Sequence, residues 1–427
     1  MKKVGVAILG LGVVGGGTYK MLTEHREFYK KNHSIDIVVE SVLERNTERA
    51  ISLGVEKSVI AESIEDICNN SDVDIVVEVM GGIEPAKTFV LAALNAGKSV
   101  VTSNKELFCK FWHELEKVAK LNGCGLFYEA TCVGGVPVIR TLLDNLQGNK
   151  ITSIMGIING TTNYILTKMT DCGVSYNEVL KEAQSLGYAE ADPTADVEGY
   201  DAVYKLSILS SLSFHTKVPF TKIYREGITD IDSDDLRYGK QLGYILKLLA
   251  IGKNTDSGIE VRVHPAFIKS THPLAGVNDS YNAVYITGDC VENIMLYGRG
   301  AGAMPTASAI VGDVIYCATH SDFNYSTFNN TENADPTTNF IADFSGAYYM
   351  RLKAQDKAGV LSKVTSVLSK HNISVAQVIQ ESGRADGTVP IMLVTHETYE
   401  NDIWKAVNEI NSDGGFATVS AVIRVCG

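Results

Sequence analysis

The amino-acid sequence predicts a multidomain protein of the α/β and α+β classes, and three patterns in its 427 residues support this. First, an apolar run, VGVAIL, ends at a glycine-rich turn. Second, strands and helices alternate as far as residue 130, which is typical of a Rossmann-like, doubly wound parallel sheet. Third, the last 80 or so residues follow the strand–helix–strand–strand–helix–strand order of a ferredoxin-like domain.

The first region is expected to form a parallel sheet because its short apolar strands are separated by helices that can cross over a sheet. The expected strands cover residues 4–9, 36–43, 74–80, 98–102 and 125–129, and the expected helices cover 13–31, 85–97 and 106–121.

The second region begins near residue 131, where this alternation stops. Its expected strands cover residues 151–158, 259–269, 282–289 and 291–297, and its helices start at 159 and cover 175–186, 196–213 and 306–318. The pattern predicts an α+β domain with a mostly antiparallel sheet. Because such a sheet can leave one face open, we expect that face to pair two subunits.

These patterns divide the chain into four segments. Residues 1–130 form the first domain, with residues 300–320 packing back on it, and residues 131–320 form the second. Residues 321–346 are rich in Asn, Thr and Asp and are expected to be a linker. Residues 347–427 form the last domain.

Composition narrows the class of protein. The net charge of −12 argues against nucleic acid or an anionic membrane surface as a partner. The eight cysteines are scattered, with no CxxC pair and no zinc-site spacing, so we expect reduced thiols. No signal peptide precedes the first strand, and no apolar run reaches the ~18 residues that a membrane span needs. These features predict a soluble, cytoplasmic protein.

The glycine-rich turn predicts a dinucleotide site in the first domain. Gly10, Gly12 and Gly15 stand in G-x-G-x-x-G register between a strand and a helix, which is the context that this fingerprint requires. Gly10 permits the tight turn, Gly12 lets the backbone approach a pyrophosphate, and Gly15 lets helix and strand pack closely. Val13 and Val14 begin the helix, whose N–H groups would bind the anion. The alternative is a glycine-rich turn without a function.

The residues after the second strand leave the choice of cofactor open. Glu44 would accept hydrogen bonds from a ribose diol, which favours NAD. Arg45 would hold a 2′-phosphate, which favours NADP, although it is also compatible with a surface arginine that has no role.

Two lysines are the catalytic candidates. Lys105 follows the strand at 98–102, so it lies at the carboxyl ends of the strands, where open α/β sheets bind ligands. Lys205 follows Asp201 by four residues in a helix whose expected N-cap is Asp196, so Asp201 and Lys205 share a face. The alternatives are a solvent-exposed lysine at a helix start and an exposed ion pair worth at most about 0.5 kcal/mol.

The segment that leads to Lys205 gathers an unusual number of carboxylates. They are Glu190, Asp192, Asp196, Glu198 and Asp201. Acidic side chains repel one another and are costly to group unless a cation or an ammonium-bearing ligand needs them. The segment therefore predicts a site that binds a substrate ammonium beside a lysine.

This segment resembles the signature of homoserine dehydrogenases, which ends in D-hydrophobic-x-G-x-D-x-x-x-K. The elements present are Ala183, Gly187-Tyr188, Asp192-Pro193, Asp196-Val197, Gly199, Asp201 and Lys205, without departure. Further motifs of the family are GLGVVG near the start, SNK at 103–105, EATCVGGVP at 129–137, NGTTNYIL at 159–166 and GRGAGAMPT at 298–306. The resemblance covers residues 1 to about 320.

The resemblance implies NAD(P)-dependent interconversion of L-homoserine and L-aspartate 4-semialdehyde, a step toward threonine and methionine. It implies that Lys205 donates the proton to the aldehyde oxygen. Lys105 would orient the substrate, contribute to proton transfer and lie close to the nicotinamide. Because a lysine at its usual pKa of about 10.4 is a poor base near neutral pH, we expect desolvation or a cationic neighbour to tune it.

The resemblance also implies how the substrate and the cofactor are held. Glu190, helped by Asp196 and Asp201, would bind the substrate ammonium, and Gly160 and Thr161 would hold its carboxylate. The remaining cofactor residues would be Gly187, Gly302 and Arg45, and the basic family position that Arg45 matches favours NADP.

A monovalent cation, expected to be Na⁺, is implied as well. Its ligands would be Glu129, Cys132, Gly134 and Val136. Cys132 departs from the usual aliphatic residue, but a backbone carbonyl ligand does not depend on its side chain. A purely structural carboxylate is the alternative for Glu129.

Residues 347–427 resemble an ACT domain, in which DKAGVL at 356–361 matches the turn used at ligand sites. Gly359 would let the backbone approach a small amino acid. The implied effector is an end-product amino acid, with threonine as the first candidate, and the implied assembly is a homodimer or homotetramer. A module that only mediates oligomerisation is the alternative.

Two other functions stay open. One is a dehydrogenase for another amino-acid semialdehyde, because the acidic residues select an ammonium without fixing the length of the substrate. The other is a sensor that binds dinucleotide and amino acid without chemistry, which the presence of both Lys105 and Lys205 disfavours.

Overall fold

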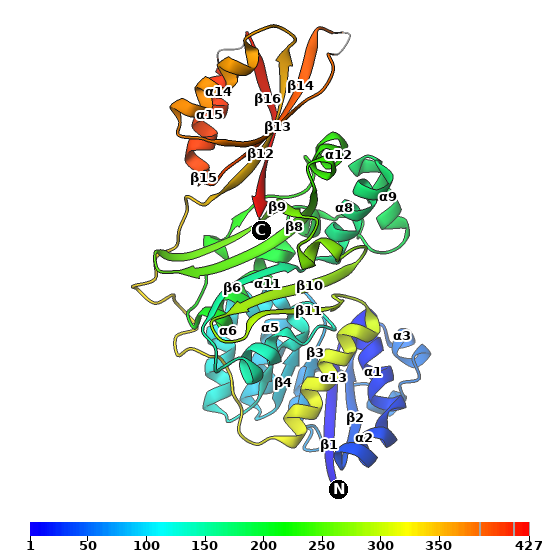
Figure 1. The fold of residues 1–427 in the computed structure, drawn as a ribbon. Coiled ribbons are helices and arrows are strands. Elements are labelled where there is room, and N and C mark those ends of the chain that lie inside the picture. The colour runs from blue at the N-terminus through cyan, green and yellow to red at the C-terminus, as the bar shows by residue number, and fades with distance from the viewer. Residues whose placement is uncertain (384–385, 413–414, 427) are drawn as a thin grey trace. The chain divides into compact units, whose positions relative to one another are not determined.

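The computed structural model describes residues 1–383, 386–412 and 415–426 (Figure 1). The chain divides into two compact units. The first unit comprises Met1–Gly160, Asp201–Ile223 and Tyr281–Thr338, and the second comprises Thr161–Tyr200, Tyr224–Ser280 and Asn339–Gly427. Each unit gathers segments that are distant in the sequence, so the four expected segments stay predictions.

A five-stranded parallel sheet forms the centre of the first unit, in the order β2-β1-β3-β4-β5. The strands are β1 (Lys2–Leu9), β2 (Ile35–Leu43), β3 (Ile75–Glu78), β4 (Ser99–Thr102) and β5 (Leu126–Phe127). The order reverses between β1 and β3, which defines the topological switch point at which open sheets bind ligands. The predicted Rossmann-like sheet is confirmed.

The register brings the carboxyl ends of these strands to one level. Leu9 pairs with Leu43 of β2 and with Glu78 of β3, and Glu78 pairs in turn with Thr102 of β4. The glycine turn and the segments that follow β2 and β4 therefore leave the sheet at the same edge.

Helices cover this sheet: α1 (Val13–Glu24), α2 (Arg26–His33), α3 (Thr47–Ser52), α4 (Ile64–Asn69), α5 (Ala86–Asn95) and α6 (Lys105–Leu121). The helix expected at 13–31 is two helices, because His25, with φ −96° and ψ 11°, interrupts it. Helix α13 (Ala303–Thr319) returns to pack on α1, where a Cβ on Gly17 would lie 2.7 Å from the Ala303 carbonyl oxygen. Only a glycine permits this approach.

The first unit also holds an antiparallel set of strands, β6 (Ile151–Ile157), β10 (Tyr281–Gly288) and β11 (Glu292–Arg299). Strand β10 pairs with both of the others. The short helix α7 (Val138–Arg140) precedes β6, and α11 (Tyr200–Phe214) carries Lys205.

The second unit is built on a long hairpin that the sequence analysis assigned only in part. Strand β8 (Tyr244–Thr255) pairs with β9 (Gly258–Lys269) along all 12 residues of each strand. The sequence of β8 is an apolar run without alternation, and such runs are compatible with either a strand or a helix. Helix α12 (Ser233–Gln241) was also not predicted, whereas α8 (Gly160–Cys172) and α9 (Tyr176–Ser185) lie close to the expected positions.

The C-terminal part of the second unit has the predicted ferredoxin-like architecture. Its elements are β12 (Ser345–Gln355), α14 (Val360–Lys370), β13 (Val375–Gln380), β14 (Thr388–Thr395), β15 (Thr398–Tyr399), α15 (Glu400–Ser412) and β16 (Ala417–Cys426). The sheet order is β16-β12-β14-β13, and both helices pack on its hydrophobic core. Strand β16 has a second neighbour, because Arg424, Val425 and Cys426 pair in parallel with β9.

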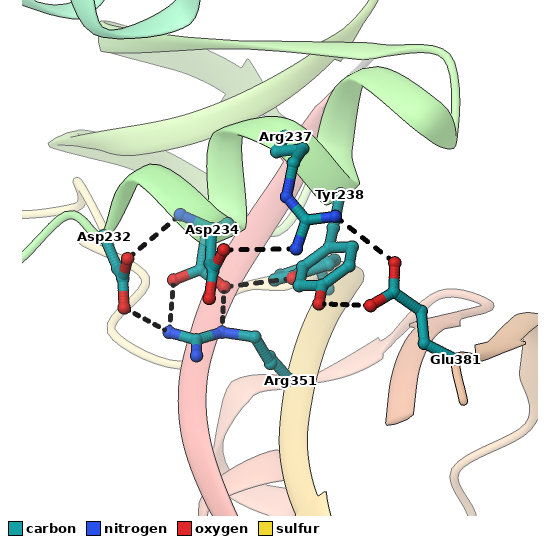
Figure 2. A network of polar contacts seen from close by, with 8 residues as sticks. Asp232, Asp234, Arg237, Tyr238, Arg351 and Glu381 are labelled. Atoms are coloured by element: carbon teal, nitrogen blue, oxygen red, sulfur yellow. Dashed lines mark hydrogen bonds and ion pairs between the residues drawn. The ribbon is translucent and has the colours of Figure 1, made fainter. Parts of the chain in front are cut away.

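A network of charged residues links α12 to this C-terminal sheet (Figure 2). Arg351 of β12 binds Asp232 at 2.9 Å and Asp235 at 2.6 Å. Two residues of α12 contact Glu381, which follows β13. Arg237 pairs with Glu381 at 3.2 Å, and the Tyr238 hydroxyl donates to it at 2.9 Å.

The polar segment expected to be a linker makes specific contacts along its first part. The Tyr325 hydroxyl donates to the Cys124 carbonyl at 2.9 Å, and Thr327 Oγ1 donates to the Leu212 carbonyl at 2.8 Å. Residues up to Thr338 therefore belong to the first unit. Among the described residues, no helix is both long and apolar enough to cross a membrane.

Candidate active site

Lys105 and Lys205 meet at one carboxylate in the first unit. Lys105 Nζ lies 2.9 Å from Asp201 Oδ1, and Lys205 Nζ lies 2.7 Å from Asp201 Oδ2. Lys105 is the first residue of α6, directly after the N-cap Asn104, and Lys205 lies one turn after Asp201 in α11. The expected convergence of the two lysines is thus present, with a carboxylate between them.

Burial distinguishes this cluster from an exposed ion pair. Asp201 is 6% and Lys205 is 9% exposed, whereas the Lys105 side chain is 38% exposed. Lys205 Nζ also donates to the Ile158 carbonyl at 2.8 Å, which fixes its direction. The buried lysine therefore has a defined position, and the more exposed one faces solvent in part.

Two positive charges act on Asp201. Burial alone would raise the pKa of Asp201, but the charges of Lys105 and Lys205 outweigh burial. Hydrogen bonds from Lys205 and from Asn159 Nδ2, at 2.9 Å, act in the same direction, so the pKa lies well below the usual range. Asp201 stays ionised, and the three charges sum to a net positive charge.

The helix that carries Lys205 begins later than expected. Residues Thr194–Val197 form a separate short helix, α10, and Gly199 follows with φ +81°. Since that left-handed conformation ends a helix, α11 starts at Tyr200. Asp196 is therefore not its N-cap, and the prediction was wrong on this point.

Asp201 also differs from its expected use. Asp201 was expected, together with Asp196, to help Glu190 bind the substrate ammonium. In the structure its oxygens contact Lys105, Lys205 and Asn159, so lysine ammonium groups already take that place.

A cleft of about 1060 Å³ opens at the carboxyl edge of the parallel sheet and is lined by Gly10 and Gly12. Gly10 has φ +91°, and a Cβ on Gly12 would meet no atom within 4 Å. A Cβ on Gly15 would lie 2.0 Å from the Gly10 carbonyl oxygen, so the helix packs closely on the turn. Open space at Gly12 and close packing at Gly15 are what a pyrophosphate on the turn requires. Val13 is 68% exposed at the start of α1, and Val14 follows it.

Three carboxylates, Glu44, Glu48 and Glu62, and three cations line this cleft. Glu44 accepts hydrogen bonds from the backbone N–H groups of Leu11, at 2.6 Å, and Asn46, at 2.9 Å. Burial raises the pKa of the Glu44 carboxyl, but these hydrogen bonds together lower it by more. The pKa of Glu44 therefore lies below its usual value. The cations that line the cleft are Arg45, Arg49 and Lys57.

The loop that contains the expected cation ligands packs beside α11. Both carboxylate oxygens of Glu129 accept backbone N–H groups, from Ile139 at 2.9 Å and Arg140 at 2.6 Å. The side chain thus caps α7, and burial and the charge of Asp313 raise the pKa of Glu129 to about 8. The Cys132 thiol lies 3.8 Å from the Lys205 carbonyl oxygen.

The same loop contains backbone that few side chains tolerate. Val133 and Gly134 have φ values of +57° and +49°. A Cβ on Gly134 would lie 2.4 Å from the Gly300 carbonyl oxygen, and the Gly135 N–H donates to the Arg299 carbonyl at 3.0 Å. Within the described ranges, no three or more His, Cys, Asp or Glu residues are grouped to hold a metal, so a cation here would need backbone carbonyls such as that of Val136.

The other predicted residues take the following places. Gly160 is the first residue of α8, and the Thr161 hydroxyl donates to the Tyr188 carbonyl at 2.7 Å. Glu190 is exposed and Asp196 is half-buried in the second unit. Gly187, with φ +74°, follows α9, and Gly302, with φ +117°, is the N-cap of α13.

Sequence reasoning missed four residues of these sites. Asn159 precedes Gly160 in the NGTTNYIL motif, and its position at the end of a strand could have marked it. Arg49 and Lys57 lie beyond the fingerprint, and nothing in their spacing placed them at the cleft. Glu78 is fully buried at the end of β3 and accepts the Thr102 hydroxyl at 2.6 Å.

Comparisons with known proteins identify matching families along most of the chain. A family model described as "Homoserine dehydrogenase, NAD binding domain" matches residues 10–129, and one described as "Homoserine dehydrogenase" matches residues 137–315. A third, described as "ACT domain", matches residues 348–415.

Curated relatives match over the full length. The chain is 38% identical over 431 residues to a homoserine dehydrogenase of Bacillus subtilis (strain 168), which covers 100% of this chain and 99% of that one. It is 39% identical over 438 residues to a homoserine dehydrogenase of Pseudomonas aeruginosa, with 100% and 99% coverage.

Solved structures agree with these matches. A homoserine dehydrogenase from Thiobacillus denitrificans superposes with a TM-score of 0.92 at 39% identity, and covers 100% of this chain and 99% of that chain. A hyperthermophilic archaeal homoserine dehydrogenase in complex with NADPH has a TM-score of 0.63 at 30% identity, and covers 74% of this chain and 97% of that chain.

Proposed function

This chain belongs to the homoserine dehydrogenase family, and from this premise we propose how its residues carry out the reaction. It is an NAD(P)-dependent oxidoreductase that interconverts L-homoserine and L-aspartate 4-semialdehyde. The observation that carries the proposed mechanism is the binding of both Lys105 and Lys205 to Asp201.

Lys205 is the proton donor to the aldehyde oxygen when the semialdehyde is reduced, and it accepts the proton in the reverse direction. The bound nicotinamide supplies or accepts the hydride. Asp201 and the Ile158 carbonyl hold the Lys205 ammonium in one direction, so little reorganisation is needed during proton transfer. Lys105, the more exposed lysine, adds a second positive charge that stabilises the developing alkoxide.

Substitution of Lys205 tests this mechanism. Lys205→Ala should lower kcat by about 1,000-fold, because it removes a general acid, while dinucleotide affinity stays unchanged. Absorbance of the reduced nicotinamide measures the first quantity and fluorescence titration the second. Lys217→Met is a matched control, since Lys217 is also buried in the first unit, at 7% exposure, but donates to the Cys109 carbonyl. Near-normal turnover in Lys205→Ala would rule out the mechanism.

The cofactor is proposed to be NADP. Two observations support this: Arg45, Arg49 and Lys57 line the cleft of the glycine turn, and the Glu44 carboxylate is engaged by backbone N–H groups. Arg45→Ala should raise the KM for NADPH by about 10-fold or more, because a charge-assisted contact to a phosphate is worth ~1.5–3 kcal/mol. The KM for NADH should not change, and Lys20→Ala on α1 is the exposed control. Equal effects on both cofactors would contradict the assignment.

A monovalent cation, expected to be Na⁺, is proposed to bind the carbonyl oxygens of Glu129, Cys132, Gly134 and Val136. Carbonyls are hard oxygen donors suited to such ions. Since the Glu129 carboxylate caps α7, Glu129 would contribute its carbonyl oxygen. Replacement of NaCl by choline chloride should lower the melting temperature and kcat, and no response to Na⁺ would remove the proposal.

The proposed substrate contacts are Glu190 and Asp196 for the ammonium, and Gly160 and Thr161 for the carboxylate. Asp201, which was expected to help bind the ammonium, is proposed instead to hold the two lysines. Glu190→Gln should then raise the KM for homoserine by about 10-fold or more, since a hydrogen-bonded charge pair is worth ~1.5–3 kcal/mol. An unchanged KM would exclude Glu190 as a ligand.

The ACT domain is proposed to bind an amino-acid effector, with threonine as the first candidate, in a homodimer or homotetramer. Because β16 pairs with β9, deletion of the domain would also remove a neighbour of β9, so a point variant is the better test. Gly359→Val changes a residue with φ +87° at the N-cap of α14. Equal threonine titrations for both proteins would contradict an effector at this turn, and sedimentation measures the assembly.

A further inference from the structure

The turn Glu198–Tyr200 directly precedes Asp201 in the chain. Gly199, with φ +81°, separates α10 from α11, and Tyr200 is the first residue of α11. Because Asp201 follows Tyr200 in the first turn of α11, the position of this turn decides where the Asp201 carboxylate lies. Any residue that fixes the turn therefore acts on the group that holds Lys105 and Lys205.

Arg225, at the end of strand β7 (Tyr224–Arg225), makes several contacts to this turn. Its guanidinium donates to the Glu198 carbonyl and pairs with Glu198 Oε2 at 3.3 Å. It also donates to the Tyr200 hydroxyl at 3.0 Å and lies over the Tyr200 ring, 3.9 Å from its centroid. A planar, multiply donating guanidinium suits this set of partners, and a lysine ammonium would not reproduce it.

The residues after Arg225 pack against the same turn with no spare space. A Cβ on Gly227 would lie 2.6 Å from the Val197 carbonyl oxygen, and the Ile228 N–H donates to that carbonyl at 2.9 Å. The Thr229 hydroxyl donates to Glu198 Oε1 at 3.2 Å. The turn is thus held from one side by the segment that begins with β7.

Strand β7 is itself held firmly in the second unit. It pairs in parallel with β9, and the Glu226 N–H donates to the Val263 carbonyl at 2.8 Å. On either side of Arg225, Tyr224 and Glu226 bind the guanidinium of Arg424 in β16, at 2.8 and 2.6 Å. Since Arg424 is only 5% exposed, this attachment is part of the packed interior.

We propose that Arg225 is a positioning residue for the dehydrogenase reaction, which fixes Asp201 through the turn Glu198–Tyr200. This inference rests on the proposed function of Asp201 and the two lysines. Arg225 contacts Glu198 and Tyr200, and its proposed effect is on the geometry of the Asp201 carboxylate. A displacement of about 1 Å at a catalytic group can cost ~100-fold in rate.

The test compares Arg225→Ala and Arg225→Lys with Arg237→Ala. Arg237 is the control, because like Arg225 it pairs with carboxylate and lies over a tyrosine ring: it contacts Asp234 and Glu381 and is 4.1 Å from the Tyr238 ring centroid. We expect kcat to fall by about 30-fold in Arg225→Ala, as a partial displacement would produce. The affinity for the dinucleotide and the melting temperature should match those of Arg237→Ala. Arg225→Lys keeps the charge opposite Glu198 and should recover part of kcat.

Two outcomes overturn the proposal. One is a kcat for Arg225→Ala that equals the kcat of Arg237→Ala. The other is a loss of kcat in parallel with dinucleotide affinity and melting temperature, which would indicate a structural role only. Lys205→Ala separates this proposal from the mechanism: if Lys205→Ala is inactive and Arg225→Ala is normal, only the positioning role fails. If Lys205→Ala is active, the mechanism fails first.

Discussion

Two clusters in this chain join a buried aspartate to basic side chains, and they have opposite charge. In the first unit, Asp201 faces two lysines, so cations outnumber carboxylates. In the second unit, Asp232 and Asp235 share Arg351, so carboxylates outnumber cations (Figure 2). The Asp201 cluster, with its excess of positive charge, can stabilise the further negative charge of an alkoxide. The Asp235 cluster has no excess of positive charge to offer.

The pKa values of the two aspartates reflect the same difference. Burial dominates at Asp235, which is 2% exposed, and raises its pKa although Arg351 and Tyr349 donate to it. At Asp201, burial is outweighed by two lysines, and the pKa lies well below its usual range. Burial alone therefore does not predict the charge state of a carboxylate, whereas the balance of nearby charges does.

The comparison predicts its largest effect for Asp201→Asn. This change removes the negative charge that holds both lysines at one point, so kcat should fall by about 100- to 1,000-fold. Dinucleotide affinity should stay within about 2-fold of the wild-type value, because the contacts at the glycine turn do not involve Asp201. Steady-state kinetics and fluorescence titration measure the two effects, and a kcat within about 3-fold of the wild type would break the comparison.

A smaller effect, on stability instead of rate, is expected for Arg351→Met. Loss of the guanidinium leaves Asp235 buried without a cation, which should lower the free energy of unfolding by about 3 kcal/mol. Arg237→Met is the control, since its side chain is 47% exposed and surface pairs contribute about 1 kcal/mol or less. Urea unfolding measures both variants. Loss of kcat without loss of stability in Arg351→Met would show that the second cluster is not purely structural.

The smallest effect is expected in the pH dependence of stability. The pKa of Asp201 is lowered on folding, so its contribution is present above the unfolded-state pKa and is lost as the pH falls below about 4. The pKa of Asp235 is raised on folding, so its contribution is present at low pH and is lost as the pH rises through the raised value. Relative to the wild type, Asp201→Asn and Asp235→Asn should therefore change in stability with opposite slopes as the pH is lowered. Melting temperatures of both variants and the wild type, measured as the pH is lowered, test this prediction. Parallel slopes for the two variants would contradict the opposite pKa shifts assigned to Asp201 and Asp235.

The sequence predicted those parts of the sites that depend on local patterns. The strand before Gly10, the helix after it and the spacing of Asp201 and Lys205 are all set by residues close together in the chain. Asn159, Arg225 and the cations Arg49 and Lys57 reach their sites only through the tertiary fold, so no spacing rule indicates them. Strand β8 was missed because a buried apolar run does not reveal its secondary structure.

The pairing of β16 with β9 has a consequence for how the protein is made. Strand β9 emerges from the ribosome well before β16, so its edge at Ala266, Phe267 and Ile268 stays without its final neighbour until the last strand is synthesised. An unpaired strand edge can join with other chains, and a nascent chain at this stage is exposed to that risk. Completion of the second unit is therefore a late event in biosynthesis.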